Sequence, residues 1–343
     1  MRAKIKKRFL AVLFFGIIFA LAYFVLFSPA TILNFSGNDS PQPSPTPKME
    51  KSPLSGLACE NAKERPIAVM LGSDEIGRPL SGLAQADLVF EMPVITGGIN
   101  RLMAVYLCEE PKEIGSIRSA RHDFIPLAKG VDAIFAHWGG SHFALDKLDS
   151  GVINNLDALK NPADAFWRKT GVAAPFNGFS SFSELKNAAQ KLSYRLEGNF
   201  AGYPHLENYS PSATSTKVLT VGYPGQFRVS YQYDPVTNNY ARFRNGSKEM
   251  DKNTKTQVFA SNVVLMTAFS RQIEGQYNDV DVEGQGNAVV YRNGEEIKGV
   301  WKKDAKNQSS KLFFYDEKGG EIKFAPGQIW VEVIEPGTAV SWK

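Results

Sequence analysis

The chain has 343 residues, of which 43% are hydrophobic and 22% charged, and its formal net charge is +4. Five basic residues lie within the first eight positions, and removing them from the total of 39 leaves 34 basic residues against 35 acidic ones. The rest of the chain is therefore close to neutral, which excludes the basic surface of a general nucleic-acid-binding protein, and we expect no nucleic-acid partner.

The N-terminus has the pattern of a membrane anchor. A basic stub, residues 1–8, precedes an uncharged apolar run from Phe9 to Phe27. A helix of this length spans roughly 28 Å, close to the hydrocarbon thickness of a bilayer. Basic residues before the run predict a cytoplasmic N-terminus and an extracytoplasmic remainder, so the expected location is the cell membrane, with a single pass. A cleaved signal peptide is the alternative, although its apolar region is usually only about 7–15 residues long.

Residues 28–64 read as a linker and entry segment. Prolines recur among serine, asparagine and lysine between Ser36 and Pro53, a composition that favours an extended spacer and cannot bury a core. Cys59 follows a leucine and an alanine as in a lipobox, but it lies too far from the apolar run to belong to a signal. Outside the cytoplasm, Cys59 and Cys108 are expected to form a disulfide, the alternative being two unrelated thiols.

From residue 65 to about 210 the chain alternates between strand-like and helix-like patterns. Short apolar runs predict strands, and apolar residues at helical spacing predict helices. Strands are expected at 66–71, 88–91, 102–107 and 131–137, and helices at 119–129, 143–148 and 183–192. Ser180 or Ser181 is expected to cap the last helix. This alternation predicts an α/β or α+β domain, a mixed sheet with covering helices.

Residues 211–343 form a smaller, β-rich part. Eight short strand-like runs follow one another, separated by turn signals such as Asn245-Gly246 and Asn293-Gly294. Asn-Gly between such runs is typical of hairpins. We expect an antiparallel sandwich or open barrel, and we leave open whether these strands complete the sheet of the preceding domain.

Unusual residues gather between positions 91 and 140, in loops beside predicted strands. Loops at strand ends are where binding chemistry is usually built. The candidate ligand-binding residues are Glu91, Gly97, Gly98, Arg101, Arg118, Ser119, Arg121, His137, Gly139 and Gly140.

The three arginines indicate anion binding. Arg118 and Arg121 are three residues apart near the start of an expected helix, so they would share one helical face. Two guanidinium groups there could hold a carboxylate or phosphate, helped by free amides at the helix start. The alternative is an internal network in which the arginines pair with Glu91, Asp87 or Asp123. The spacing of His122, His137 and His142 does not indicate a metal site, and we expect no metal and no cofactor.

Phrases along the chain resemble those of the YerB-like bacterial envelope proteins, a family of uncharacterised function. The matching phrases are Ser52-Pro-Leu-Ser-Gly-Leu57, Arg65-Pro-Ile-Ala-Val-Met70, Arg78-Pro-Leu-Ser-Gly-Leu83 through Glu91, Gly97-Gly-Ile-Asn-Arg101, Gly115-Ser-Ile-Arg-Ser-Ala-Arg121, His137-Trp-Gly-Gly-Ser141 and Pro326-Gly-Gln-Ile-Trp330. The resemblance implies an envelope location and a fold of two parts, but it transfers no reaction. Members named lipoproteins carry a lipidated cysteine, whereas this chain has the predicted anchor.

The leading hypothesis is a membrane-anchored extracytoplasmic module that binds an anionic envelope ligand or a protein partner. The alternative is an envelope hydrolase in which Glu91 and His137 act as acid and base while the arginines hold an anionic substrate. A scaffold without a ligand is the third hypothesis, and it predicts an exposed apolar patch on the β-rich part. Whether the chain is an enzyme is left open.

Overall fold

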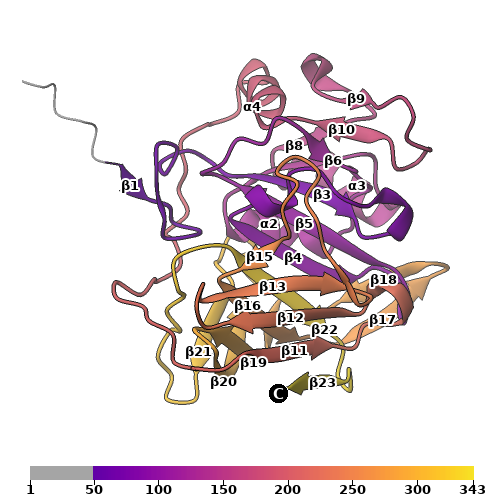
Figure 1. Ribbon diagram of the computed structural model, residues 1–343. Helices are drawn as coiled ribbons and strands as arrows, with labels where there is room; N and C mark the ends of the chain where they lie inside the picture. The colour runs from indigo at the N-terminus through magenta and orange to yellow at the C-terminus, as the bar shows by residue number, and fades with distance from the viewer. Residues whose placement is uncertain (1–48) are drawn as a thin grey trace, which may run out of the picture. The chain divides into compact units, whose positions relative to one another are not determined.

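A ten-stranded mixed sheet runs through residues 49–343, the part of the chain that the computed structural model describes (Figure 1). Its strands, in spatial order, are β21 (Phe313–Asp316), β20 (Glu295–Lys303), β19 (Gly284–Arg292), β16 (Asn262–Thr267), β22 (Ile329–Ile334), β4 (Leu88–Pro93), β5 (Asn100–Tyr106), β3 (Ile67–Gly72), β7 (Ile134–His137) and β8 (Asn155–Asp157). The predicted anchor and most of the predicted linker lie outside these residues. Within them, no helix is long and apolar enough to cross a membrane.

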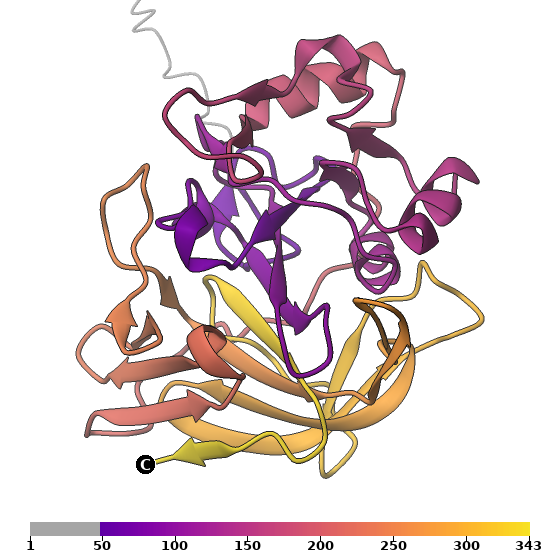
Figure 2. The same ribbon diagram turned by 90° about the vertical axis from the view of Figure 1, so that its right-hand side faces the viewer.

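The two predicted parts of the chain share this sheet. Strand β22, near the C-terminus, pairs in parallel with β4, so that Ile329 lies opposite Leu88 and Glu332 opposite Glu91. The β-rich part therefore completes the sheet of the α/β part. Residues 49–343 form one compact unit, and Figure 2 shows the long strands of the second part curving beneath the first.

Each face of the large sheet is covered by a separate layer. Helices α2 (Phe124–Gly130) and α3 (His142–Asp149) pack on one face, against side chains such as Met103 and Phe135. Helix α4 (Phe182–Lys191) and a second sheet pack on the other face. The second sheet consists of β14 (Ser247–Lys248), β13 (Asn239–Arg244), β12 (Val229–Asp234), β11 (Lys217–Val221) and β23 (Val340–Trp342), with β15 (Phe259–Ala260) beside β13.

Short elements complete the described chain. They are β1 (Glu50–Lys51) with β2 (Ala58–Cys59), β6 (Ile114–Gly115) with β10 (Gly178–Ser180) and β9 (Trp167–Arg168), the hairpin of β17 (Ser270–Glu274) and β18 (Tyr277–Val280), and the 3-10 turns η1 (Glu75–Gly77), η2 (Leu83–Gln85), η3 (Pro162–Asp164) and η4 (Gly225–Phe227).

The structure confirms most of the predicted elements, including α4 and its cap Ser181, whose hydroxyl accepts a hydrogen bond from the Glu184 amide. The helix predicted at 119–129 is wrong at its start, because α2 begins only at Phe124. Residues 117–120 instead form backbone hydrogen bonds to neighbouring strands. The Arg118 amide donates to the Met70 carbonyl at 2.9 Å, and this use of the backbone prevents a helix there.

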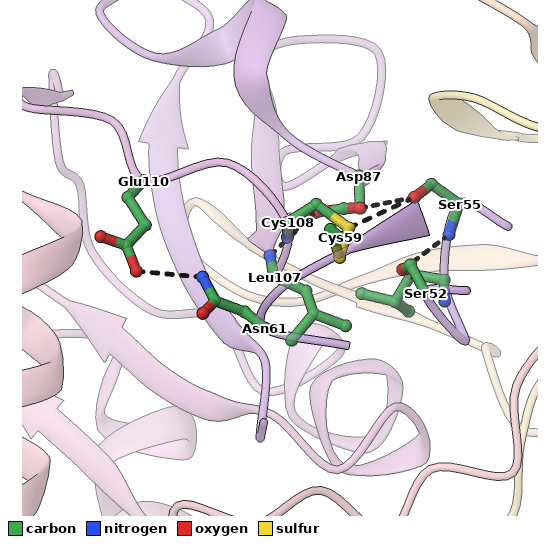
Figure 3. The surroundings of a disulfide bond; sticks show 9 residues. Ser52, Ser55, Cys59, Asn61, Asp87, Leu107, Cys108 and Glu110 are labelled. Atoms are coloured by element: carbon green, nitrogen blue, oxygen red, sulfur yellow. Dashed lines mark hydrogen bonds between the residues drawn. A yellow bond between two sulfur atoms is a disulfide. The ribbon is translucent and has the colours of Figure 1, made fainter. Parts of the chain in front are cut away.

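The predicted disulfide between Cys59 and Cys108 is confirmed, with a Cα–Cα distance of 5.5 Å (Figure 3). Beside it, the buried carboxylate of Asp87 accepts hydrogen bonds from the Ser55 hydroxyl at 2.7 Å and from the Leu107 and Cys108 amides. Burial raises the pKa of Asp87. The disulfide and Asp87 thus attach the entry segment to the start of β4 and the end of β5.

Candidate functional site

The three predicted arginines come together at the carboxyl end of β3. Strands β3, β4 and β7 are parallel to one another, because β3 and β4 each pair antiparallel with β5 and β7 pairs in parallel with β3. Their carboxyl ends therefore lie at one edge of the sheet, the usual place for a ligand site in such sheets. Arg101 lies opposite Gly72, the last residue of β3. The segment holding Arg118 and Arg121 crosses the same edge.

Arg101 is almost fully buried and forms an ion pair with Asp74, at 3.2 Å between Nη1 and Oδ2. Burial, together with the positive charges of Arg118 and Arg121, lowers the pKa of Arg101 to about 10. The side chain of Arg118 packs over Gly72, beside the Asp74 carboxylate that pairs with Arg101, so these two arginines lie close together, and Arg121 follows on the same segment. Asp74, which follows the end of β3, was missed in the sequence, although its place beside a strand end is the same signal that identified the others.

Arg118 and Arg121 are held mainly by aromatic rings and carbonyl groups. The guanidinium of Arg118 lies 4.7 Å from the centre of the Phe176 ring, and its Nη1 donates to the Pro175 carbonyl at 3.1 Å. The guanidinium of Arg121 lies 5.5 Å from the Tyr277 ring. Burial lowers the pKa of both arginines. Since neither lies in a helix, the predicted pairing on one helical face is wrong, and the sheet edge brings them together instead.

The balance of charge at this edge is positive. Among residues 49–343, the Arg101–Asp74 contact is the one ion pair formed by the three arginines. The Nε atoms of Arg101 and Arg121 are buried and have no hydrogen-bond partner within the same described residues. A buried donor without a partner costs about 1–3 kcal/mol. Three guanidinium groups with spare donors can bind an oxyanion, such as a phosphate or a carboxylate.

Glu91 does not belong to this arginine cluster. Successive side chains of a strand point to opposite faces, and Glu91 pairs with Leu102 while Arg101 pairs with Met92, so the two side chains lie on opposite faces of the sheet. Glu91 is fully buried and accepts a bidentate pair of hydrogen bonds from Arg244, at 2.8 and 2.6 Å.

Strand β13 of the second sheet supplies the partners of Glu91. Arg242 and Arg244 point from this strand into the layer between the two sheets, where they also pair with Glu249. Burial would raise the pKa of Glu91, but Arg244 and Arg242 outweigh it and hold the value at about 2. No local pattern could identify these partners, because they come about 150 residues later in the chain. Glu91 therefore joins the two parts of the fold.

His137 is a fully buried structural residue at the end of β7. Its Nδ1 lies 2.8 Å from the Gly139 carbonyl, and its Nε2 lies 3.2 Å from Oδ1 of Asn155. Gly139 has a φ of +60°, and a side chain there would meet Leu159. Gly140 lies beside Ala120, which donates its amide to the Gly139 carbonyl. These residues shape the loop that supports the arginine segment.

The remaining predicted residues are Ser119, within the arginine segment itself, and two glycines in another loop. Ser119 is half-buried between Arg118 and Ala120. Gly97 and Gly98 form the turn between β4 and β5, and they line a pocket of about 310 Å³ together with Tyr223 and the segment 335–339. None of the three arginines lines that pocket.

The distance between Glu91 and His137 excludes the predicted acid–base pair. Strands β5 and β3 lie between β4 and β7, so the two residues are separated by three strand spacings, roughly 14 Å. Their side chains also point to opposite faces, since His137 follows Phe135 on the face of α2 while Glu91 faces the second sheet. An acid and a base must both reach the reacting atoms, within hydrogen-bond distance or through one water. The hydrolase alternative is therefore wrong in its chosen residues.

A second basic pocket, of about 420 Å³, lies beside the buried network. Arg78, Arg244 and Lys248 line it together with the acids Glu75 and Glu249. Burial, and then the charge of Arg244, lower the pKa of Arg78 to about 10. Its Nε and Nη2 atoms are buried without a hydrogen-bond partner in the described chain. This pocket is a second place where an anion could bind. Here, however, the two acidic side chains offset most of the charge of the three basic ones.

Comparison with known proteins gives consistent matches. Residues 54–195 match the N-terminal domain, and residues 219–331 the C-terminal domain, of a family described as protein of unknown function DUF3048. A Bacillus subtilis (strain 168) protein named "Putative lipoprotein YerB" is 29% identical over 302 residues, covering 86% of this chain and 89% of that protein. The crystal structure of YerB protein from Bacillus subtilis is similar with a TM-score of 0.75 at 28% identity, covering 85% of this chain and 99% of the other.

Proposed function

The chain belongs to the YerB-like DUF3048 family, and from this premise we propose that it is an extracytoplasmic module of the bacterial envelope that binds an anionic ligand. The ligand would bind to the guanidinium groups of Arg101, Arg118 and Arg121. The observation that supports the proposal is the position of these three arginines at one sheet edge, where the contact between Arg101 and Asp74 is their one ion pair within residues 49–343.

Binding of an oxyanion follows from the donors at this edge. The unpartnered Nε atoms of Arg101 and Arg121 belong to side chains that are more than nine-tenths buried, so both are held in place before a ligand arrives. A pre-positioned donor loses little conformational entropy on binding. A charge-assisted hydrogen bond contributes about 1.5–3 kcal/mol, so two of them contribute about 3–6 kcal/mol, which corresponds to a dissociation constant between roughly tens of micromolar and several millimolar.

The location outside the cytoplasm is supported by three features. The run from Phe9 to Phe27 has the length and flanking charge of an anchor. The disulfide of Cys59 and Cys108 fits an oxidising compartment. The similar Bacillus subtilis protein is named a lipoprotein. This chain would differ from a lipoprotein by using a single transmembrane helix in place of a lipid, with the N-terminus in the cytoplasm.

The experiment is a calorimetric titration of the full chain in mild detergent. Two probes represent the anions of an envelope: an oligomer of glycerol phosphate, and a short peptide with a free C-terminal carboxylate. Arg118→Gln is the main variant, because Arg118 is only half-buried and its loss should leave the fold intact. Arg228→Gln is the matched control, since Arg228 is an exposed arginine outside the cluster. Arg78→Gln tests the second basic pocket.

Support would be saturable binding of one probe, with at least about tenfold lower affinity for Arg118→Gln and unchanged affinity for Arg228→Gln. Equal loss in both variants would mean unspecific charge attraction and would overturn the proposal. Loss in Arg78→Gln alone would move the site to the other pocket. Absence of binding for both probes would leave the scaffold hypothesis in its place.

A further inference from the structure

Three potential metal ligands converge beside the start of α2. His122 and Asp123 precede the helix, and Asp279 reaches them from strand β18. The Nε2 atom of His122 lies 3.2 Å from Oδ1 of Asp123 and 3.2 Å from Oδ1 of Asp279. All three donor atoms lie within 4.8 Å of one another. Two neighbouring ligands of a metal ion with bonds of 2.0–2.2 Å are separated by about 2.9–3.5 Å, which matches these distances.

Two buried polar atoms at this point have no hydrogen-bond partner within residues 49–343: Nδ1 of His122 and Oδ2 of Asp123. The Nε2 atom of His122 can carry one proton, which can satisfy one of the two carboxylate oxygens that face it. The Asp123 side chain is 3% exposed, and its Oδ2 has no hydrogen-bond partner within residues 49–343. Its Oδ1 accepts the Val280 amide at 3.2 Å. A buried carboxylate with an unsatisfied oxygen is costly unless a cation compensates it.

We propose that His122, Asp123 and Asp279 form a binding site for a divalent transition-metal ion. One imidazole nitrogen and two carboxylate oxygens suit Zn²⁺ or Mn²⁺, with water completing the coordination. The two carboxylates neutralise the charge of the ion. The site ties the β17–β18 hairpin to the start of α2, and it is independent of the proposed anion function.

The surrounding charges are compatible with this site. Arg271, on the same hairpin, pairs with Oδ2 of Asp279 and leaves Oδ1 directed at the histidine. Lys147 and Arg121 are the other cations that affect His122. The guanidinium of Arg121 is directed toward the Tyr277 ring.

Sequence spacing could not identify this site. His122 and Asp123 are adjacent, which is not a recognisable ligand spacing, and the third ligand lies in a hairpin 156 residues after Asp123. The expectation of no metal, which is wrong if this site binds an ion, came from the spacing of His122, His137 and His142 and of the acidic residues near them in the sequence. Of these, His137 is engaged elsewhere, and His142 is half-exposed and pairs with Glu274.

The test is metal titration of the full chain after treatment with a chelator. ZnCl₂ and MnCl₂ are titrated separately by calorimetry, and the melting temperature is recorded with and without each ion. Asp279→Asn is the main variant, because Asp279 lies on a hairpin and is partly exposed, so folding should survive. Asp281→Asn is the matched control, being an exposed acid on the same side that also pairs with Arg271. His122→Gln is the second variant, and Arg118→Gln separates this site from the anion site.

The expected result is one ion bound per chain with a raised melting temperature. Affinity should fall at least about tenfold in Asp279→Asn and in His122→Gln, and it should be unchanged in Asp281→Asn and Arg118→Gln. Absence of binding at millimolar Zn²⁺ and Mn²⁺ would overturn the proposal. Equal affinity of Asp279→Asn and Asp281→Asn would overturn it as well, since the ion would then bind elsewhere.

Discussion

Glu91 and Glu332 lie directly opposite each other on the parallel strands β4 and β22, and both are fully buried. Two carboxylates at neighbouring positions would repel each other if both were ionised. The pKa of Glu91 is held at about 2 by Arg244 and Arg242 despite its burial, whereas burial and the charge of Glu91 raise the pKa of Glu332. The network therefore keeps one carboxylate charged and favours a proton on the other.

Substitution by glutamine should lower the free energy of unfolding much more at Glu91 than at Glu332. Glu91→Gln leaves two buried arginines without their main counter-charge, and breaking a buried pair in this way typically costs about 3–5 kcal/mol. Glu332→Gln replaces a carboxyl group that favours its neutral form, and we expect a change of less than about 1 kcal/mol. Urea unfolding monitored by tryptophan fluorescence measures both. A comparable loss in the two variants would refute the assignment of charge.

Acid should unfold the protein partly through Glu91. Its folded pKa of about 2 lies below the ordinary value of 4.5, so its contribution is complete above about pH 4.5 and is lost as the pH falls toward 2. A shift of this size corresponds to at most about 3 kcal/mol. The free energy of unfolding, measured from pH 5 to pH 2.5, should fall less steeply in Glu91→Gln than in Glu332→Gln. Parallel curves would contradict the prediction.

Lys303 should produce a second rise of stability with pH, in alkali. Its side chain is buried and donates to the Gln308 and Ser310 carbonyls, and burial lowers its pKa from 10.5 to about 8. Between pH 8 and 10.5 the unfolded chain keeps a proton that the folded chain has lost, so stability rises with pH by about 1–3 kcal/mol. Lys303→Met should remove this rise, and Lys302→Met, at the exposed neighbouring position, should retain it.

The sequence predicted the strands well because their pattern is local. Periodicity within 66–71 or 102–107 depends on neighbouring residues, and it identified β3 and β5. The join between β4 and β22 depends on contacts more than 240 residues apart, which no local pattern contains.

The lack of long-range contacts in any local pattern also explains which parts of the candidate site could be predicted. The three arginines were found because they stand near strand ends. Their predicted grouping with Glu91 is wrong, because alternate side chains of a strand point to opposite faces of the sheet. Glu91 points to the other face, where it pairs with Arg242 and Arg244. The partners Tyr277 and Asp279 come from a hairpin whose position depends on the whole fold.

The disulfide should contribute substantially to stability. Cys59 and Cys108 are 49 residues apart in the sequence, and the loss of loop entropy in the unfolded chain predicts about 4 kcal/mol. Replacing both cysteines by serine should lower the urea midpoint by a corresponding amount without changing the slope greatly. The wild-type chain in reducing agent should behave like the double variant. If reduction left the midpoint unchanged, the disulfide would have no such role.

The three arginines should cost stability in the absence of a ligand. Arg118 repels Arg101, and Asp74 pairs directly with Arg101 alone, so Arg118→Gln should raise the free energy of unfolding by about 0.5 kcal/mol at low salt. Phosphate should stabilise the wild-type chain more than chloride does at equal ionic strength, because it binds the folded state. In Arg118→Gln this difference should shrink, while Arg228→Gln keeps it. The melting temperature in the two salts measures the effect, and an equal response of all three proteins would show that the arginines bind no anion.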